Sequence, residues 1–250
     1  MVCLFCRRAM KPGMSNSDRG VFTEAVRTFW GVRGTQGVHQ GREGRRDAGR
    51  RTEVTGGRHM DGFVGTVSSL LQKSGVSPST IFVRKGGIVL PGFFRATKQW
   101  DLLVISEGRL KAVVEFKAIV GSFGNNLNNR SEEALGNAVD LWTAYREGTF
   151  PNSPQPWLGF FFLVEDAPKS RMEIGVKEPH FKARPEFRGT NYAQRAEVLC
   201  RKLVLERHYS SACLLLANPG RVAEDPNYSE PAIDLSAKQF VDSLTRHVRP

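Results

Sequence analysis

Three charged residues, Asp101, Glu115 and Lys117, lie in or beside two apolar runs, where buried strands seldom carry charge. A Glu-Gly pair separates the two runs, which is typical of a β-hairpin. If the loop holds residues 107–109, antiparallel pairing places Asp101 opposite Glu115 on one face. Lys117 points to the same face, because side chains two residues apart on a strand share a side. The spacing therefore predicts two carboxylates and an ammonium group at one end of a sheet.

These residue types are suited to metal-assisted hydrolysis of a phosphodiester. Carboxylate oxygens are ligands that Mg²⁺ prefers, with water and substrate phosphate completing its shell. The ion lowers the pKa of bound water and neutralises charge on the phosphate oxygens, and a lysine orients or deprotonates that water or stabilises the developing anion. The alternative is an ordinary hairpin whose Asp101 and Lys117 face solvent. The apolar neighbours of Glu115 and Lys117 favour the active site.

The remaining elements form the framework that positions these residues. Apolar stripes at helical spacing predict helices at residues 21–29, 60–71 and 192–209, and from Ser236 onward. Continuous apolar runs predict strands that are covered on both faces, at residues 157–164 and 212–217. The order of these elements predicts an α/β fold with a central mixed β-sheet flanked by helices.

The composition favours a polyanionic partner. Lysine and arginine number 36 against 25 aspartates and glutamates, which gives a net charge of +11. Such an excess indicates binding to nucleic acid or to an anionic membrane surface. No apolar run reaches membrane-spanning length, and the amino terminus lacks a signal-peptide pattern. We therefore expect a cytoplasmic protein that binds nucleic acid and no membrane.

The chain is long enough for one sizeable core, and we expect a single domain over residues 18–250. Residues 1–17 are expected to be a disordered or wrongly assigned N-terminal extension, since Met10 and Met14 offer alternative starts. Residues 31–58 hold eight glycines, seven arginines and almost no large apolar residue. That composition predicts a flexible basic segment, either ordered by DNA or simply solvated.

A polar loop is expected after Lys117. Four asparagines and an arginine fall close together there: Asn125, Asn126, Asn128, Asn129 and Arg130. Asparagine can bond adenine, and arginine guanine, in the major groove, so we expect contact with DNA. The alternative is that the asparagines turn the chain and cap a helix that begins near Asn129, with Glu132 in a capping box. Arg188, in the basic connection 165–190, is expected to contact phosphates.

Longer strings of the sequence resemble the XhoI family of type II restriction endonucleases. The matching strings are residues 91–101, 115–117, 121–130, 141–148, 165–171 and 185–189. The resemblance runs from about residue 59 to about residue 216, and such strings are more specific than the catalytic spacing alone. Gln99 and Trp100 precede Asp101 where the PD-(D/E)xK superfamily, to which this family belongs, has a proline.

The resemblance implies a PD-(D/E)xK restriction-endonuclease-like core with catalytic roles for Asp101, Glu115 and Lys117. It implies that Mg²⁺ is held by Asp101, Glu115 and the main-chain carbonyl of Phe116. It further implies a homodimer that cleaves double-stranded DNA at the palindrome CTCGAG and leaves four-base 5′ overhangs. A cognate DNA methyltransferase would accompany such an enzyme.

Two other functions stay open. A structure-selective DNA repair or junction-resolving nuclease could use the same core, and it would cut many sequences at nicks or junctions. A non-catalytic DNA-binding protein is the second, although intact Asp101, Glu115 and Lys117 argue against it. Digestion of a plasmid of known sequence with Mg²⁺, followed by sequencing of the ends, distinguishes the three possible functions.

Overall fold

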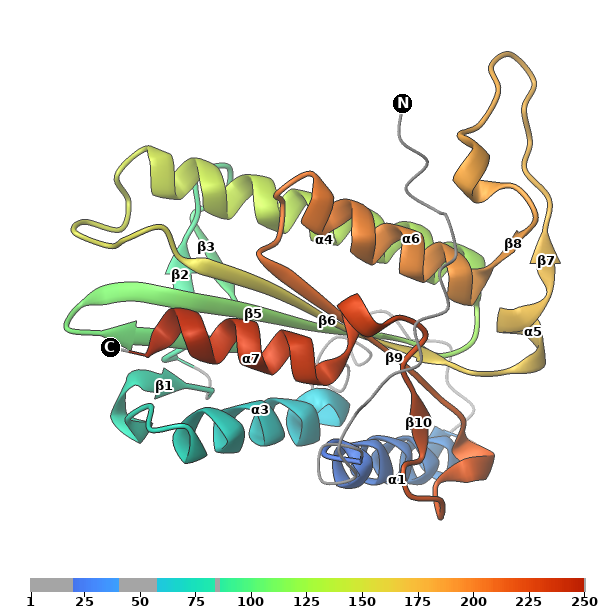
Figure 1. The fold of residues 1–250 in the computed structure, drawn as a ribbon, viewed down its shortest axis with the longest axis horizontal. Coiled ribbons are helices and arrows are strands. Elements are labelled where there is room, and N and C mark those ends of the chain that lie inside the picture. The colour runs from blue at the N-terminus through green and yellow to red at the C-terminus, as the bar shows by residue number, and fades with distance from the viewer. Residues whose placement is uncertain (1–19, 41–57, 84–85, 250) are drawn as a thin grey trace.

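A six-stranded mixed sheet lies between two layers of helices (Figure 1). The computed structural model describes residues 20–40, 58–83 and 86–249. In spatial order the strands are β1 (Ile81–Phe82), β4 (Leu102–Ser106), β5 (Arg109–Ile119), β6 (Trp157–Glu165), β9 (Ser211–Ala217) and β10 (Tyr228–Ser229). Strands β5, β6 and β9 pair in parallel, and the other pairs are antiparallel. The predicted α/β class with a mixed, helix-flanked sheet is confirmed.

Each face of the sheet is covered by its own set of helices (Figure 1). One set is α4 (Phe123–Arg146) and α6 (Tyr192–Leu205), and the other is α1 (Thr23–Gln40), α3 (Asp61–Lys73) and α7 (Ala237–Val248). Along β6, Phe160 and Phe162 join the hydrophobic cluster under α4 and α6, whereas Phe161 joins the opposite cluster. The continuous apolar run at 157–164 is thus covered on both faces, as predicted.

Shorter elements complete the chain. They are the helix α5 (Pro168–Arg171) and the 3₁₀ helices Arg58–Met60, Pro78–Thr80, Pro185–Phe187, Pro219–Arg221 and Ile233–Leu235. Two small antiparallel sheets pair β2 (Val89–Pro91) with β3 (Thr97–Gln99) and β7 (Glu173–Ile174) with β8 (Thr190–Asn191). The segment between β7 and β8 forms an arm that extends away from the main sheet (Figure 1).

The hairpin of β4 and β5 has a tighter turn than the sequence suggested. Ser106 pairs with Arg109, so the loop is Glu107-Gly108 and not residues 107–109. Both loop residues have positive φ, 53° and 70°, as a type I′ turn requires. The register then shifts by one residue beside Val104 through a β-bulge. The bulge offsets the shorter turn, so the predicted register at the far end of the hairpin is still correct.

The first ten residues of the basic segment predicted at residues 31–58 lie in helix α1. Helix α1 continues to Gln40, and the buried side chains of Val26, Phe29 and Trp30 hold its first half on the core. Residues 41–57, and the expected N-terminal extension 1–17, lie outside the described residues. Within the described residues, no helix is both long and apolar enough to span a membrane.

Candidate active site

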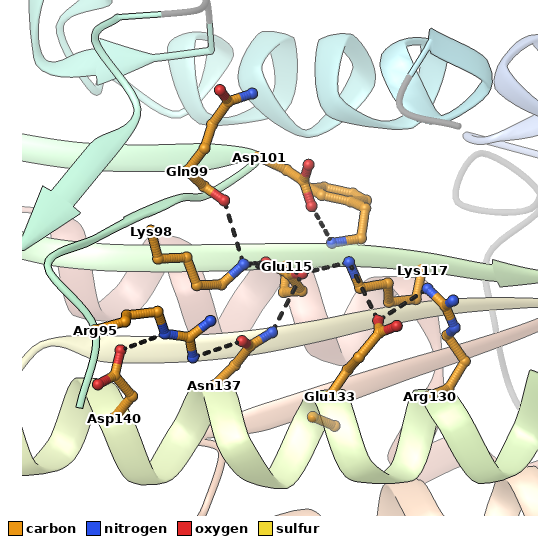
Figure 2. A network of polar contacts seen from close by, with 12 residues as sticks. Arg95, Lys98, Gln99, Asp101, Glu115, Lys117, Arg130, Glu133, Asn137 and Asp140 are labelled. Carbon is orange, nitrogen blue, oxygen red and sulfur yellow. Dashed lines mark hydrogen bonds and ion pairs between the residues drawn. The ribbon is translucent and has the colours of Figure 1, made fainter. Parts of the chain in front are cut away.

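Asp101 and Glu115 meet where β4 begins (Figure 2). Leu102 pairs with Val114, and the same register carries Asp101 opposite Glu115. The backbone N–H of Phe116 donates a 2.7 Å hydrogen bond to Asp101 Oδ2. The N–H and carbonyl of one residue point to the same side of an extended strand. The Phe116 carbonyl therefore points toward Asp101 as well.

Lys117 joins these carboxylates from β5. Its ammonium nitrogen lies 2.5 Å from Glu115 Oε1 and 3.7 Å from Glu133 Oε2 on α4. Glu115 and Lys117 are two residues apart on one strand, so their side chains share the face that α4 covers. The structure thus brings Asp101, Glu115 and Lys117 together as the spacing predicts, and their chemical roles stay predictions.

Burial and mutual charge determine the ionisation of this group. Burial, with the negative charge of Glu115, raises the pKa of Asp101 from 3.8 to about 7. Burial alone would also raise the pKa of Glu115, but the ammonium groups of Lys117 and Lys98 hold it below its ordinary value. Burial would lower the pKa of Lys117, whereas the Glu115 carboxylate raises it above its ordinary value. Lys117 is therefore a cation, suited to stabilise negative charge rather than to remove a proton.

Lys98 is a second cation at Glu115 that the sequence analysis missed. Its ammonium nitrogen lies 3.0 Å from Glu115 Oε2 and 4.4 Å from the centre of the Trp100 ring. Strand alternation alone would place Lys98 and Asp101 on opposite faces. The alternation does not continue, because β3 ends at Gln99 in a separate small sheet. The sequence signal for this contact was the presence of a basic residue three positions before Asp101.

A polar stripe on α4 lines the other side of the site (Figure 2). Arg130, Glu133, Asn137 and Asp140 are spaced by three or four residues, which places them on one side of the helix. Asn137 Nδ2 donates to Glu115 Oε1 at 3.4 Å, and Arg130 Nη1 lies 2.9 Å from Glu133 Oε2. This spacing is visible in the sequence, so a polar stripe within an otherwise packed helix was the missed signal.

The asparagine-rich segment is the beginning of α4 and not a loop. Helix α4 begins at Phe123, so Asn125, Asn126, Asn128, Asn129 and Arg130 lie in its first two turns. Asparagine is a weak helix former, but Phe123 and Leu127 are buried four residues apart and hold these turns on the core. The expected helix start near Asn129 is therefore wrong. Glu132 forms no capping box and accepts a 2.8 Å hydrogen bond from the Asn128 side chain.

The side chains of this segment differ in their freedom to meet a ligand. Asn126 donates to the Gly121 carbonyl at 3.0 Å and so ties the helix to the chain before it. Arg130 is partly buried against Glu133. Asn125 and Asn129 are exposed, and their spacing of four residues places them on one face of α4.

Arg188 lies on the arm between β7 and β8, and its contacts keep it there. Its guanidinium bonds Glu178 Oε1 at 3.1 Å and the Ala183 carbonyl at 3.2 Å. About half of its side chain is exposed. The structure does not bring Arg188 to the carboxylates, and a role in phosphate contact stays a prediction.

Comparison with known proteins assigns this chain to a family. A sequence model of the restriction endonuclease XhoI family matches residues 39–230. The chain belongs to the XhoI restriction endonuclease family. The type II restriction enzyme BstVI of Geobacillus stearothermophilus is 49% identical over 209 residues, covering 81% of this chain and 92% of BstVI. No solved structure matches the chain.

Two further relatives are also type II restriction enzymes. The type II restriction enzyme XhoI of Xanthomonas vasicola is 43% identical over 183 residues, 72% of this chain and 73% of that enzyme. The type II restriction enzyme AbrI of Azospirillum brasilense is 48% identical over 160 residues, 64% of this chain and 72% of AbrI. The predicted family is confirmed, and with it the predicted class of enzyme, a site-specific deoxyribonuclease.

The oxygen atoms of this XhoI-family site fit a hard divalent cation. Glu115 Oε2 is buried without a hydrogen bond, although the Lys98 ammonium lies 3.0 Å away. The pKa of Asp101 is raised first by burial and then by the negative charge of Glu115, and a bound cation would offset both effects. No cluster of three His, Cys, Asp or Glu residues suited to a metal occurs in the described part of the chain. An ion such as Mg²⁺ would therefore depend on Asp101, Glu115, the Phe116 carbonyl, water and substrate.

Proposed function

We propose that this protein is a type II restriction endonuclease that cleaves double-stranded DNA by Mg²⁺-dependent phosphodiester hydrolysis. The observation that carries the proposal is the meeting of Asp101, Glu115 and Lys117 at one end of β4 and β5, in a chain of the XhoI family. The net charge of +11 supports a polyanionic substrate.

Each residue has a distinct part in this proposal. Asp101, Glu115 and the Phe116 carbonyl would hold Mg²⁺, which supplies an activated water and neutralises charge on the phosphate. Lys117, as a cation beside Glu115, would orient that water and stabilise the negative charge that develops on the phosphate oxygens. Lys98 would hold the Glu115 carboxylate in its ionised form from the other side.

The proposed site is CTCGAG, cut to leave four-base 5′ overhangs. The support is the resemblance of long strings to the XhoI family and the position of α4, whose first turns follow β5 directly. A helix can enter the major groove, where asparagine and arginine side chains discriminate bases. Asn125 and Asn129 are the residues of α4 that we expect to read bases, with Asn128 and Arg130 supporting them, whereas Asn126 ties the start of the helix to Gly121. Arg188 would contact phosphate from the arm.

A palindromic site favours a homodimer, because two symmetric subunits read two symmetric half-sites. Each subunit would then cut one strand. Sedimentation of the protein bound to one cognate duplex tests this, and a monomer on that duplex would contradict it. A cognate DNA methyltransferase that protects the same site would accompany the enzyme.

Digestion of a plasmid of known sequence with Mg²⁺, followed by sequencing of every end, tests the proposed function. We expect double-strand cuts at CTCGAG alone, with identical overhangs, and none when EDTA replaces Mg²⁺. Cuts spread over many sequences at nicks or junctions would indicate a structure-selective nuclease. Tight binding without any cut would indicate a non-catalytic DNA-binding protein.

A further inference from the structure

Two adjacent phenylalanines project from the turn between β2 and β3, close to the candidate active site. Phe93 is 50% exposed and Phe94 is 69% exposed. Their rings meet edge to face, with centroids 5.0 Å apart. Large aromatic side chains are usually buried, so two exposed ones on one turn indicate a contact surface. We refer to Phe93 and Phe94 together as the aromatic tip.

A buried carboxylate on α4 holds the aromatic tip in place. Asp140 Oδ1 accepts hydrogen bonds from the backbone N–H groups of Phe93 and Phe94, at 2.9 and 2.7 Å. Asp140 Oδ2 accepts one from Arg95 Nε at 2.8 Å. Asp140 is only 3% exposed. A carboxylate is costly to bury, so its three bonds to one turn indicate that the exact position of this turn matters.

Gly92 shows how closely the turn approaches Asp140. A Cβ atom at this position would lie 2.5 Å from Asp140 Oδ2 and 2.8 Å from the Arg95 carbonyl oxygen. Only glycine fits this approach, since the second contact is with backbone. The backbone of the aromatic tip is therefore held by the Asp140 carboxylate, while half or more of each residue stays exposed.

The same contacts connect the aromatic tip to the candidate active site (Figure 2). Arg95 Nη2 donates to Asn137 Oδ1 at 3.0 Å, and Asn137 Nδ2 donates to Glu115 Oε1 at 3.4 Å. At the other end of the turn, Lys98 pairs with the same carboxylate. The aromatic tip and Glu115 thus belong to one connected polar network, whose two α4 members, Asn137 and Asp140, are one helical turn apart.

We propose that Phe93 and Phe94 form a wedge that inserts at a base step of the DNA duplex beside the phosphate to be cut. This inference rests on the proposed function and adds a means of recognition to it. Apolar side chains that enter a base step unstack it and bend the duplex, and the cost of that distortion depends on sequence. The wedge therefore contributes to site selection without a hydrogen bond to any base.

Charge and area favour DNA over a second protein copy as the occupant. Arg95 follows the aromatic tip directly, and although it pairs with Asp140, 41% of its side chain is exposed, so its positive charge suits a phosphate backbone. Two phenylalanines bury roughly 300–500 Å² at most, below the ~800 Å² per partner of a stable protein interface. The aromatic tip alone is too small for a dimer contact and large enough for one base step.

Duplexes with 2-aminopurine at single positions in and around the site test the wedge. The site used is the one that sequencing of plasmid ends returns, and Ca²⁺ replaces Mg²⁺ so that DNA is bound uncut. We expect wild-type protein to raise the fluorescence at one base step, as unstacking does. Phe93→Ala and Phe94→Ala should each remove at least about half of this rise. Each should also lower kcat/KM for cleavage by roughly 5- to 150-fold, the usual range for one lost base–aromatic stack.

Ile233→Ala is the matched control, because Ile233 is as exposed as the aromatic tip, at 59%, and lies outside it. It should change neither the fluorescence rise nor cleavage. Wild-type cleavage without a fluorescence rise, or a rise that persists in both phenylalanine variants, would overturn the wedge alone. Loss of the dimer in either variant would overturn it in favour of a subunit contact. Absence of any wild-type cleavage would refute the proposed function and the wedge together.

Discussion

Lys98 lies against the Glu115 carboxylate, with 3.0 Å between Nζ and Oε2, although the two residues belong to different sheets. Lys117 contacts the same carboxylate from its own strand. Glu115 is therefore a buried anion between two cations, and this keeps its pKa below the ordinary value despite its burial. The arrangement keeps Glu115 ionised at neutral pH, as its proposed role in holding Mg²⁺ requires.

Removal of Lys98 should weaken cleavage and shift its pH dependence. With one cation fewer, the pKa of Glu115 rises. Because cleavage in the proposed mechanism needs the ionised form of Glu115, the cleavage rate should begin to fall at a higher pH as the solution is acidified. We expect Lys98→Ala to lower kcat by roughly 10-fold or more at neutral pH, and Lys98→Arg to recover part of the loss. The pH–rate profile measures this. Lys73→Ala, on α3, is the control, and an acid limb that stays unchanged in Lys98→Ala would contradict the argument.

Asp101→Asn, Glu115→Gln and Lys117→Ala should each remove nearly all cleavage. In the proposed mechanism, the first two changes remove ligands for Mg²⁺, and the third removes the cation beside the attacking water. We expect losses of roughly 10²- to 10³-fold or more in single-turnover cleavage, with near-native circular dichroism spectra. Glu115→Gln should be the least stable variant, since it leaves the partly buried ammonium groups of Lys98 and Lys117 without the carboxylate that both contact. Wild-type turnover in any variant would show that the active site lies elsewhere.

The metal-free protein should lose stability as pH rises through about 7. Folding raises the pKa of Asp101 from 3.8 to about 7, so the folded state favours the protonated acid. This contribution is fully present below about pH 4 and disappears as the pH passes about 7. Asp101→Asn removes the dependence and should be more stable than wild type at pH 8.5 by about 1–4 kcal/mol.

Urea unfolding in EDTA at pH 5.5 and 8.5 measures this difference. Addition of Mg²⁺ should stabilise wild type more at pH 8.5 than at pH 5.5, because the ion binds the ionised carboxylate and the folded state. Asp101→Asn should show little of this stabilisation. Parallel pH dependence in wild type and Asp101→Asn would show that another group is responsible.

Asn125→Ala and Asn129→Ala should relax sequence discrimination. Both side chains are exposed on one face of α4, and a lost bidentate base contact costs about 1–3 kcal/mol of discrimination. Competition binding between CTCGAG and a one-base variant measures the effect. Asn126→Ala is the control, because its amide bonds the Gly121 carbonyl, and it should lower stability by about 1 kcal/mol with discrimination unchanged. Unchanged discrimination in both test variants would move the search to the basic connection at residues 165–190.

The β-hairpin shows why part of the site could be predicted. Strand alternation and antiparallel pairing are local rules, so Asp101, Glu115 and Lys117 could be placed together from their spacing. The turn was predicted one residue too long, and a β-bulge near Val104 offset that error. A bulge leaves no reliable mark on a sequence, so the correct register rested on two features that happen to compensate.

The amino-acid sequence by itself determined the α/β class and the meeting of Asp101, Glu115 and Lys117, because periodicity and strand pairing act over short stretches of chain. The family followed from the resemblance of longer strings. Only the tertiary structure decided which groups surround the three residues. Lys98 arrives from a separate sheet, and Asn137 and Asp140 arrive from α4, because packing brings distant segments to one carboxylate. The helical start of α4 was also decided there, since the burial of Phe123 and Leu127 outweighs the weak helix propensity of the asparagines between and around them.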